Sequence, residues 1–358
     1  MDPGIRRDDS WRALLRSNQS VPVETAKTPY AIALLMRRVG FLASVMWLCG
    51  LLVLPASAQT YPNRAVSIVV PYPAGGSVDG VARIITQKLN ESLGRHFVVD
   101  NRAGGAGGVV GANYVAKAEP DGATLLLTAS IHVITPFLYK NIPYDVVKDF
   151  TPITLIATGP LLVSTSPKVP ADNLKDFFDL VRKDPSHFTF ATSSFGSAGH
   201  LAIELLKRDA GVDTLVIAYK GAGPALNDLM AGQVQLMVDP MLSSLPLALG
   251  KAIKPLAVTS AKRLATAPEI PTVAESGVTG FEFVSWYGLW APKNLPPALV
   301  EKLQTEVARI VAQPEVKQLL EKLGFVPVGS TTEYFTKFIT DEMEKSGKII
   351  ADANIKTE

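Results

Sequence analysis

The sequence predicts an α/β protein in which two lobes are joined by two long extended segments. Short apolar strands alternate with amphipathic helices in two separate series along the chain, an order typical of parallel sheets covered by helices. Two β-like stretches, Ile153–Ser164 and Phe281–Pro292, lie at the borders of the second series. The chain has 358 residues, of which 47% are hydrophobic and 19% are charged, so it is long enough for two globular domains.

The first series follows the order βαβαβ. Its expected strands are Val66–Val70, Phe97–Val99 and Thr124–Thr128, and its expected helices are Ser77–Leu93 and Val109–Ala116. The first helix is indicated by Val81, Ile85 and Leu89, which recur at helical spacing on one face. Because helices separate the strands, we expect a parallel sheet with helices on both faces.

The second series supplies the other lobe. Its expected helices are 173–183, 197–210 and 223–231, and its expected strands are 188–192, 214–218, 234–238 and 254–259. Three helical patterns end the chain, and we expect them to pack back on the first lobe. They begin at Pro296-Pro297, at Pro314 and at a capping box of Ser330 with Glu333. The expected boundaries are 59–160 plus 284–358 for lobe one and 161–283 for lobe two.

Residues 36–58 contain the three parts of a secretory signal peptide. The basic start Met36-Arg37-Arg38 precedes the apolar run Val39–Leu54, and Ala56-Ser57-Ala58 forms a small-residue cleavage site. We therefore expect cleavage after Ala58 and a periplasmic location. The apolar run is shorter than the ~20 residues that span a bilayer, and a membrane-tethered interaction protein is the alternative. Residues 1–35 show no sustained periodicity, so we expect a disordered or misassigned extension there.

Charge and cysteine usage argue against several kinds of partner. Residues 1–58 contain seven Lys or Arg and four Asp or Glu, which leaves residues 59–358 nearly neutral. No basic cluster favours a nucleic-acid partner. The single cysteine, Cys49, lies inside the apolar run, so the mature protein would have no disulfide. The four histidines have no metal-ligand spacing, and we expect a monomer without metal or cofactor.

Five clusters of small residues stand where a strand gives way to the next segment, in most cases a helix. They are 71–79, 101–108, 128–130, 193–200 and 219–224. A helix N-terminus exposes unpaired N–H groups and the positive end of the helix dipole, and glycine lets a ligand approach that backbone closely. In open α/β sheets, ligands bind in the crevice outside the strand carboxyl ends. We therefore expect these clusters to hold a small anion in one cleft.

Several side chains near these clusters have two interpretations. Asp79 lies in the first turn of its helix, where it either stabilises the helix or contacts a ligand. Asp239 ends an apolar strand, where it either begins a turn or accepts a hydrogen bond from a ligand amine. Four aromatic side chains either line the pocket or belong to the core: Tyr72, Phe195, Trp286 and Tyr287.

Catalytic and nucleotide-binding motifs are incomplete. Ser197 and His200 are near neighbours, so a Ser/His hydrolase of small esters is an alternative function. However, Phe195 occupies the first glycine position of Gly-x-Ser-x-Gly. The glycines at 105 and 107 lack the third glycine of a dinucleotide fingerprint, because position 110 is valine.

These motifs resemble those of the Bug-type extracytoplasmic solute receptors, the binding proteins of tripartite tricarboxylate transporters. The segments that carry the resemblance are Tyr61-Pro62, Pro71–Gly76 with Asp79 and Arg83, Asn101-Arg102, Pro120–Gly122, Gly196–His200, Tyr219–Pro224 and Trp286–Pro292. They follow one another over essentially the whole mature chain. Position 103 is alanine where the family often has proline, and Gly76-Ser77 is followed by valine.

The resemblance implies a two-lobed type II periplasmic-binding-protein fold that closes around a small carboxylate, partly through bound water, without catalysis. Its ligand would be an organic acid or an amino acid, and its partners would be membrane permease subunits or the extracytoplasmic domain of a sensor. Together with the residue patterns, it gives these candidate ligand-binding residues: Tyr72, Ala74, Gly75, Gly76, Ser77, Asp79, Thr128, Ala129, Ser130, Ser193, Ser194, Ser197, Ala198, His200, Gly221, Ala222, Gly223 and Asp239.

Overall fold

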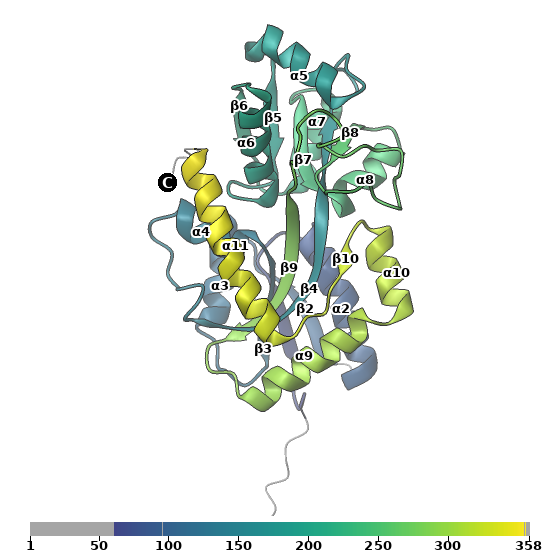
Figure 1. Cartoon of the computed structure of the whole chain (residues 1–358). Coiled ribbons are helices and arrows are strands. Elements are labelled where there is room, and N and C mark those ends of the chain that lie inside the picture. The colour runs from purple at the N-terminus through teal and green to yellow at the C-terminus, as the bar shows by residue number, and fades with distance from the viewer. Residues whose placement is uncertain (1–60, 95, 354, 356–358) are drawn as a thin grey trace, which may run out of the picture. The chain divides into compact units, whose positions relative to one another are not determined.

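The computed structural model describes residues 61–94, 96–353 and 355 (Figure 1). The predicted signal peptide at 36–58, its cleavage site and the extension at 1–35 lie outside these described residues. None of the helices in the described ranges combines the length with the apolar character that a bilayer span requires.

Three parallel strands form the first group. Strand β1 (Val66–Val70) lies between β2 (Phe97–Asn101) and β3 (Thr124–Ala129) and pairs with both in parallel. Helix α2 (Ser77–Leu93) connects β1 to β2, and α3 (Val109–Ala116) lies between β2 and β3. Parallel neighbours need such crossover connections, and the predicted βαβαβ series is confirmed.

Two long antiparallel strands continue from this group. Strand β9 (Val284–Pro292) pairs with β3 on one side and with β4 (Phe150–Thr165) on the other. Beyond Pro160, β4 pairs instead with β7 (Leu236–Pro240) and β8 (Lys254–Val258). Strand β4 therefore links the first group of strands to a second group, and Figure 1 shows it running beside β9.

The second group is again parallel at its centre. Strand β5 (Thr189–Thr192) lies between β6 (Leu215–Ala218) and β7 and is parallel to both. The helices of this group are α5 (Leu174–Lys183), α6 (Ala198–Ala210), α7 (Ala222–Ala231) and α8 (Met241–Leu249). The strand order is β2-β1-β3-β9-β4-β7-β5-β6, and β8 and the short β10 (Val326–Pro327) also pair with β4.

Three helices follow β9, as predicted: α9 (Pro297–Val311), α10 (Pro314–Lys322) and α11 (Thr332–Asp352). Helix α9 packs on α2 and β4, and α11 packs on β4 and on α4 (Ile131–Leu138). The end of the chain thus returns to the first group of strands.

The start of α11 differs from the expected capping box by one residue. Thr331 is the N-cap, and its hydroxyl accepts the Tyr334 N–H at 3.2 Å. The Ser330 hydroxyl instead accepts the Leu155 N–H of β4 at 3.0 Å. The predicted pairing of Ser330 with Glu333 is therefore wrong, because a long-range contact occupies the serine.

Two short helices, α4 and α8, were absent from the sequence prediction. Each contains an internal proline, Pro136 in α4 and Pro246 in α8, a residue that normally argues against a helix. Helix α4 also buries most of its residues, so no polar face marks it as amphipathic. Strand β7 lies farther toward the C-terminus than expected and includes Asp239.

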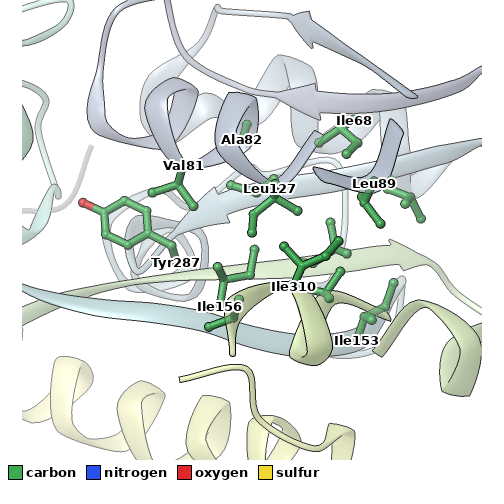
Figure 2. Packing of buried hydrophobic residues seen from close by; sticks show 14 of the residues in the cluster. Ile68, Val81, Ala82, Leu89, Leu127, Ile153, Ile156, Tyr287 and Ile310 are labelled. Atoms are coloured by element: carbon green, nitrogen blue, oxygen red, sulfur yellow. The ribbon is translucent and has the colours of Figure 1, made fainter. Parts of the chain in front are cut away.

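The main core of the first group lies between its strands and helices α2 and α9. Apolar side chains from separate elements meet there, among them Ile68, Leu127, Ile156 and Ile310 (Figure 2). Tyr287 of β9 belongs to the same cluster and is 1% exposed. Figure 2 shows its hydroxyl pointing away from Leu127 and Ile310, toward the carboxyl ends of the parallel strands, where the predicted site residues lie.

Candidate functional site

The loops at the strand carboxyl ends of the two groups face each other. A Cβ placed on Gly221, which precedes α7, would lie 4.0 Å from Pro73 Cγ in the loop after β1. A Cβ placed on Gly80 of α2 would lie 2.5 Å from Leu242 Cδ2 of α8. The predicted turns at Pro73 and Gly221 therefore meet, and we call the region between the strand ends of the two groups the strand-end site.

The loop after β1 is fixed by hydrogen bonds to neighbouring strand ends. The Tyr72 hydroxyl is 2.9 Å from Thr128 Oγ1 at the end of β3. The Tyr72 carbonyl accepts Asn101 Nδ2 at 3.1 Å, and a Cβ on Gly108 would lie 3.1 Å from the Tyr72 ring. Three strand ends are thus held together at this loop, with Ala129 of β3 9% exposed beside it.

Asp79 is engaged within the chain through both carboxylate oxygens. Oδ2 accepts the Gly75 N–H at 3.0 Å and Arg83 Nε at 2.8 Å, and Oδ1 accepts Arg83 Nη2 and Asn101 Nδ2, each at 3.0 Å. Burial alone would raise the pKa of Asp79, but the hydrogen bonds from Arg83, Gly75 and Asn101 outweigh it and lower the pKa. These bonds favour the first interpretation of Asp79, in which it positions the loop and stabilises the helix.

Two serine hydroxyls at this end are buried without a partner. Ser77, the first residue of α2, is 8% exposed, and Ser130, the N-cap of α4, is 4% exposed. Neither Oγ has a hydrogen-bond partner within 3.5 Å among the described residues, although the Ser77 hydroxyl lies near enough to the Tyr287 phenol to lower its pKa. No side chain caps α2 at Gly76 or α4 at Ser130. Both helix starts therefore combine uncapped N–H groups with an unused hydroxyl.

Asp239 is the corresponding group on the second side. It is 1% exposed at the end of β7, and its Oδ2 accepts hydrogen bonds from the Ser243 and Ser244 hydroxyls of α8. Its Oδ1 is buried and has no partner among the described residues. Burial raises the pKa of Asp239 to about 7, although the hydroxyls of Ser243, Ser193 and Ser244 act in the opposite direction.

Tyr287 joins the two sides. Burial raises the pKa of its hydroxyl, the neighbouring hydroxyls of Ser285 and Ser77 oppose this shift, and the Asp239 carboxylate raises the pKa further. The phenol therefore stays protonated, and its pKa responds both to Ser77 of the first group and to Asp239 of the second. The sequence left Tyr287 as either pocket wall or core residue, and the structure places it in the core.

The loop 193–200 is held together by its own contacts. The Ser197 hydroxyl caps α6 by accepting the His200 N–H at 3.2 Å, and it lies 2.8 Å from Thr192 Oγ1. The His200 ring accepts the Gly196 N–H through Nδ1 at 3.1 Å, and its Nε2 faces Glu204 at 3.8 Å. The serine hydroxyl thus meets the histidine backbone rather than its ring, and this geometry lacks the nucleophile–base contact of a hydrolase.

The remaining candidates divide into buried and exposed positions. Ala198 is 6% exposed, and the Ser194 hydroxyl donates to the Phe195 carbonyl at 3.3 Å. Gly221 is the N-cap of α7 and Ala222 is its first residue, and no side-chain hydrogen bond caps this helix among the described residues. The exposed candidates at the rim of the site are Ala74, Gly75 and Gly223. The candidate ligand-binding residues predicted from the sequence did not include Ser243, Ser244 or Asn101. The two serines begin four residues after Asp239, at the end of an apolar strand, and this spacing is a signal that the sequence does contain.

A separate surface hollow lies at the opposite ends of the strands. It has a volume of about 590 Å³ and is lined by Arg64, Asn113, Tyr114, Lys117 and Glu119, among others. Arg64 precedes β1, and Thr124 of the same lining begins β3, so the hollow contains none of the predicted site residues. Among the described residues, no group of His, Cys, Asp and Glu is arranged to hold a metal ion.

The fold is that of the periplasmic binding proteins. Solved structures of that class match the chain. Rpa4515 of R. palustris with adipate is 36% identical, with a TM-score of 0.81 over 83% of this chain and 100% of that chain. The periplasmic binding protein BugD is 35% identical, with a TM-score of 0.79 and the same coverage. MatC from Rhodopseudomonas palustris with bound malate is 32% identical, with a TM-score of 0.75 over 81% and 100%.

The chain belongs to the tripartite tricarboxylate transporter receptor family. The family model described as "Tripartite tricarboxylate transporter family receptor" matches residues 81–355. This family consists of periplasmic solute-binding receptors, and the resemblance to Bug-type receptors is confirmed. The predicted fold class is confirmed by the same comparisons.

Proposed function

We propose that this chain is a periplasmic receptor that captures a small carboxylate and delivers it to a membrane permease or a sensor. The ligand would lie between lobe one, residues 59–160 plus 284–358, and lobe two, residues 161–283. The signal peptide at 36–58 would be removed after Ala58. Structures of relatives with adipate and with malate support a small carboxylate as the ligand.

The observation that carries this proposal is the pair of unpartnered hydroxyls at uncapped helix starts. A buried hydroxyl without a partner costs on the order of 1–3 kcal/mol, and Ser77 and Ser130 both have this property. A carboxylate placed between them would accept both hydroxyls and the first N–H groups of α2 and α4. Helix N-termini are favourable sites for such an anion.

Contacts across the site support closure of the two lobes. The loop at Pro73 meets the loop at Gly221, and α2 meets α8 through Gly80 and Leu242. A ligand that touches both sides only when these contacts form favours the closed state by its differential affinity. In this proposal the ligand is released unchanged, since Ser197 acts as a helix cap.

A thermal-shift and calorimetry screen against mono-, di- and tricarboxylates and amino acids tests the proposal. A ligand at 100 times its dissociation constant should add about 2.7 kcal/mol of stability. Ser77→Ala and Ser130→Ala should each weaken binding by roughly tenfold or more, since each hydroxyl donates to a charged group.

Ser164→Ala is the matched control. Ser164 also has a buried hydroxyl without a partner, but it lies within β4, opposite Met237. This variant should bind the same acids with unchanged affinity. Stabilisation by neutral sugars with no response to any acid would refute the proposal, and so would equal losses of affinity in all three variants.

A further inference from the structure

Asp239 is buried, and a carboxylate ligand held by Ser77 and Ser130 would give it no hydrogen-bond partner. It lies near the end of β7, the Ser193 hydroxyl acts to lower its pKa, and its charge raises the pKa of Tyr287. Its Oδ1 is buried without a partner. A second anion placed against this oxygen would be repelled, whereas a hydrogen-bond donor would satisfy it.

The surroundings of Asp239 supply hydroxyls but no cation. Oδ2 accepts the Ser243 hydroxyl and, at 3.4 Å, the Ser244 hydroxyl. Within residues 61–94, 96–353 and 355, the interactions of this carboxylate are with serines and Tyr287, and it makes no ion pair with lysine, arginine or histidine. A buried carboxylate of this kind is costly unless a positive group pairs with it.

We infer that Asp239 makes the site selective for a carboxylate that also carries an ammonium group, that is, for an amino acid over the matching plain dicarboxylate. This inference rests on the proposed function, because it assumes that the ligand binds at the strand-end site. The ligand carboxylate lies against Ser77 and Ser130, and the ammonium donates to Asp239 Oδ1. One end of the site thus prefers a negative group and the other a positive group, and this difference sets the orientation of the bound ligand.

Isothermal titration with matched ligands tests this selectivity. Three series serve as probes: succinate, malate and aspartate; glutarate, 2-hydroxyglutarate and glutamate; adipate and 2-aminoadipate. Within the series that fits the site, we expect affinity to rise from the plain acid through the hydroxy acid to the amino acid, with at least tenfold between the ends. This comparison uses the unmodified protein and does not depend on the folding of a variant.

The Asp239→Asn variant tests whether Asp239 is the source of the selectivity for amino acids. The amide keeps the shape and removes the charge, so amino-acid affinity should fall at least tenfold while affinity for the plain dicarboxylate holds or rises. Asp184→Asn is the control for net charge, because Asp184 lies on the surface with Ser186 and His187. It should leave both affinities unchanged.

The outcomes separate the inference from the proposed function. If the plain dicarboxylate binds as tightly as its amino analogue to the unmodified protein, the inference is wrong and the carboxylate receptor stands. If the amino acid is preferred equally by Asp239→Asn, another group selects it and the inference is again wrong. If no member of any series binds, both are wrong.

Discussion

Asp79 and Asp239 are both buried at the strand ends, and their surroundings give them opposite properties. Asp79 accepts hydrogen bonds through both oxygens, two of them from the Arg83 guanidinium, so its ionised form is favoured. Asp239 has three serine hydroxyls near it and makes no ion pair within the described part of the chain, so burial dominates and raises its pKa to about 7. The first carboxylate therefore holds the loop in place, and the second keeps one oxygen, Oδ1, without a partner among the described residues.

Asp79→Asn should lower the free energy of unfolding at pH 7 by about 1–3 kcal/mol, because it breaks a buried, charge-assisted network. The folded-state pKa of Asp79 is lowered, so its stabilisation is present above the unfolded value near pH 4 and is lost as the pH falls through the folded value. Urea unfolding at pH 7 and at pH 3 measures both effects. The difference between wild type and variant should shrink at pH 3, and an undiminished difference there would show that packing, not charge, stabilises the loop.

Sequence reasoning found the glycine turns at the site but not its unpartnered atoms. Gly75, Gly221 and the serines stand next to apolar runs, so their positions at strand ends follow from local pattern. Whether Asp239 Oδ1 is free depends on Ser193, Ser243 and Tyr287, which come from separate segments of the chain. That information is set by tertiary packing and has no local signal in the sequence.

At the scale of elements, the predicted helices and strands are those with one apolar face or one short apolar run. Helix α2 matches its predicted range because Val81, Ile85 and Leu89 alternate with polar residues at helical spacing. Helices α4 and α8 have internal prolines, and α4 in addition lacks a polar face. Their sequences therefore show no clear alternation of apolar and polar residues at helical spacing. Both missed helices start at the site, directly after Ser130 and Pro240.

The close packing of α6 on β7 yields a prediction at this scale. A Cβ on Gly199 would lie 2.1 Å from the Val238 carbonyl oxygen, whereas a Cβ on Gly223 of α7 would have no heavy atom within 4 Å. Gly199→Ala should therefore destabilise the protein by about 1–3 kcal/mol or more, since backbone must move. Gly223→Ala should be neutral or stabilising by up to about 1 kcal/mol. Chemical unfolding of the two variants measures the difference, and similar stabilities would contradict this packing.

At the scale of the whole described unit, two parallel groups of strands are connected through β4 and flank β9. Strand β4 changes partners near Pro160, from β9 to β7 and β8. Relative motion about these strands would change the contacts between Pro73 and Gly221. It would also move Ile134 and Leu138 of α4 and Ile350 of α11, which pack into the apolar cluster of the second group. Ligand capture by closure therefore depends on how these helices follow the motion.

Closure can be blocked from one side by a side chain at Gly221. This residue has φ +121°, and a Cβ there would lie 4.0 Å from Pro73 Cγ, so the remaining atoms of a leucine would occupy the space that the closed contact needs. Gly211→Leu is the matched control, because Gly211 has φ +64° with no heavy atom within 4 Å of a Cβ. Gly211 has left-handed helical angles (φ 64°, ψ 40°), where a leucine costs about 1–2 kcal/mol, whereas Gly221 (φ 121°, ψ 166°) lies in a region that is essentially restricted to glycine. Gly221→Leu should therefore lose more stability than Gly211→Leu, and both are compared at a temperature where they remain folded.

Their binding should differ. Gly221→Leu should lower carboxylate affinity at least tenfold, and small-angle scattering should show no compaction when ligand is added. Gly211→Leu should bind and compact as the wild type does, because its side chain points into open space. If both variants bind normally, the Pro73–Gly221 contact is not part of the bound state. If both fail equally, backbone strain explains the loss and the closure mechanism loses this support.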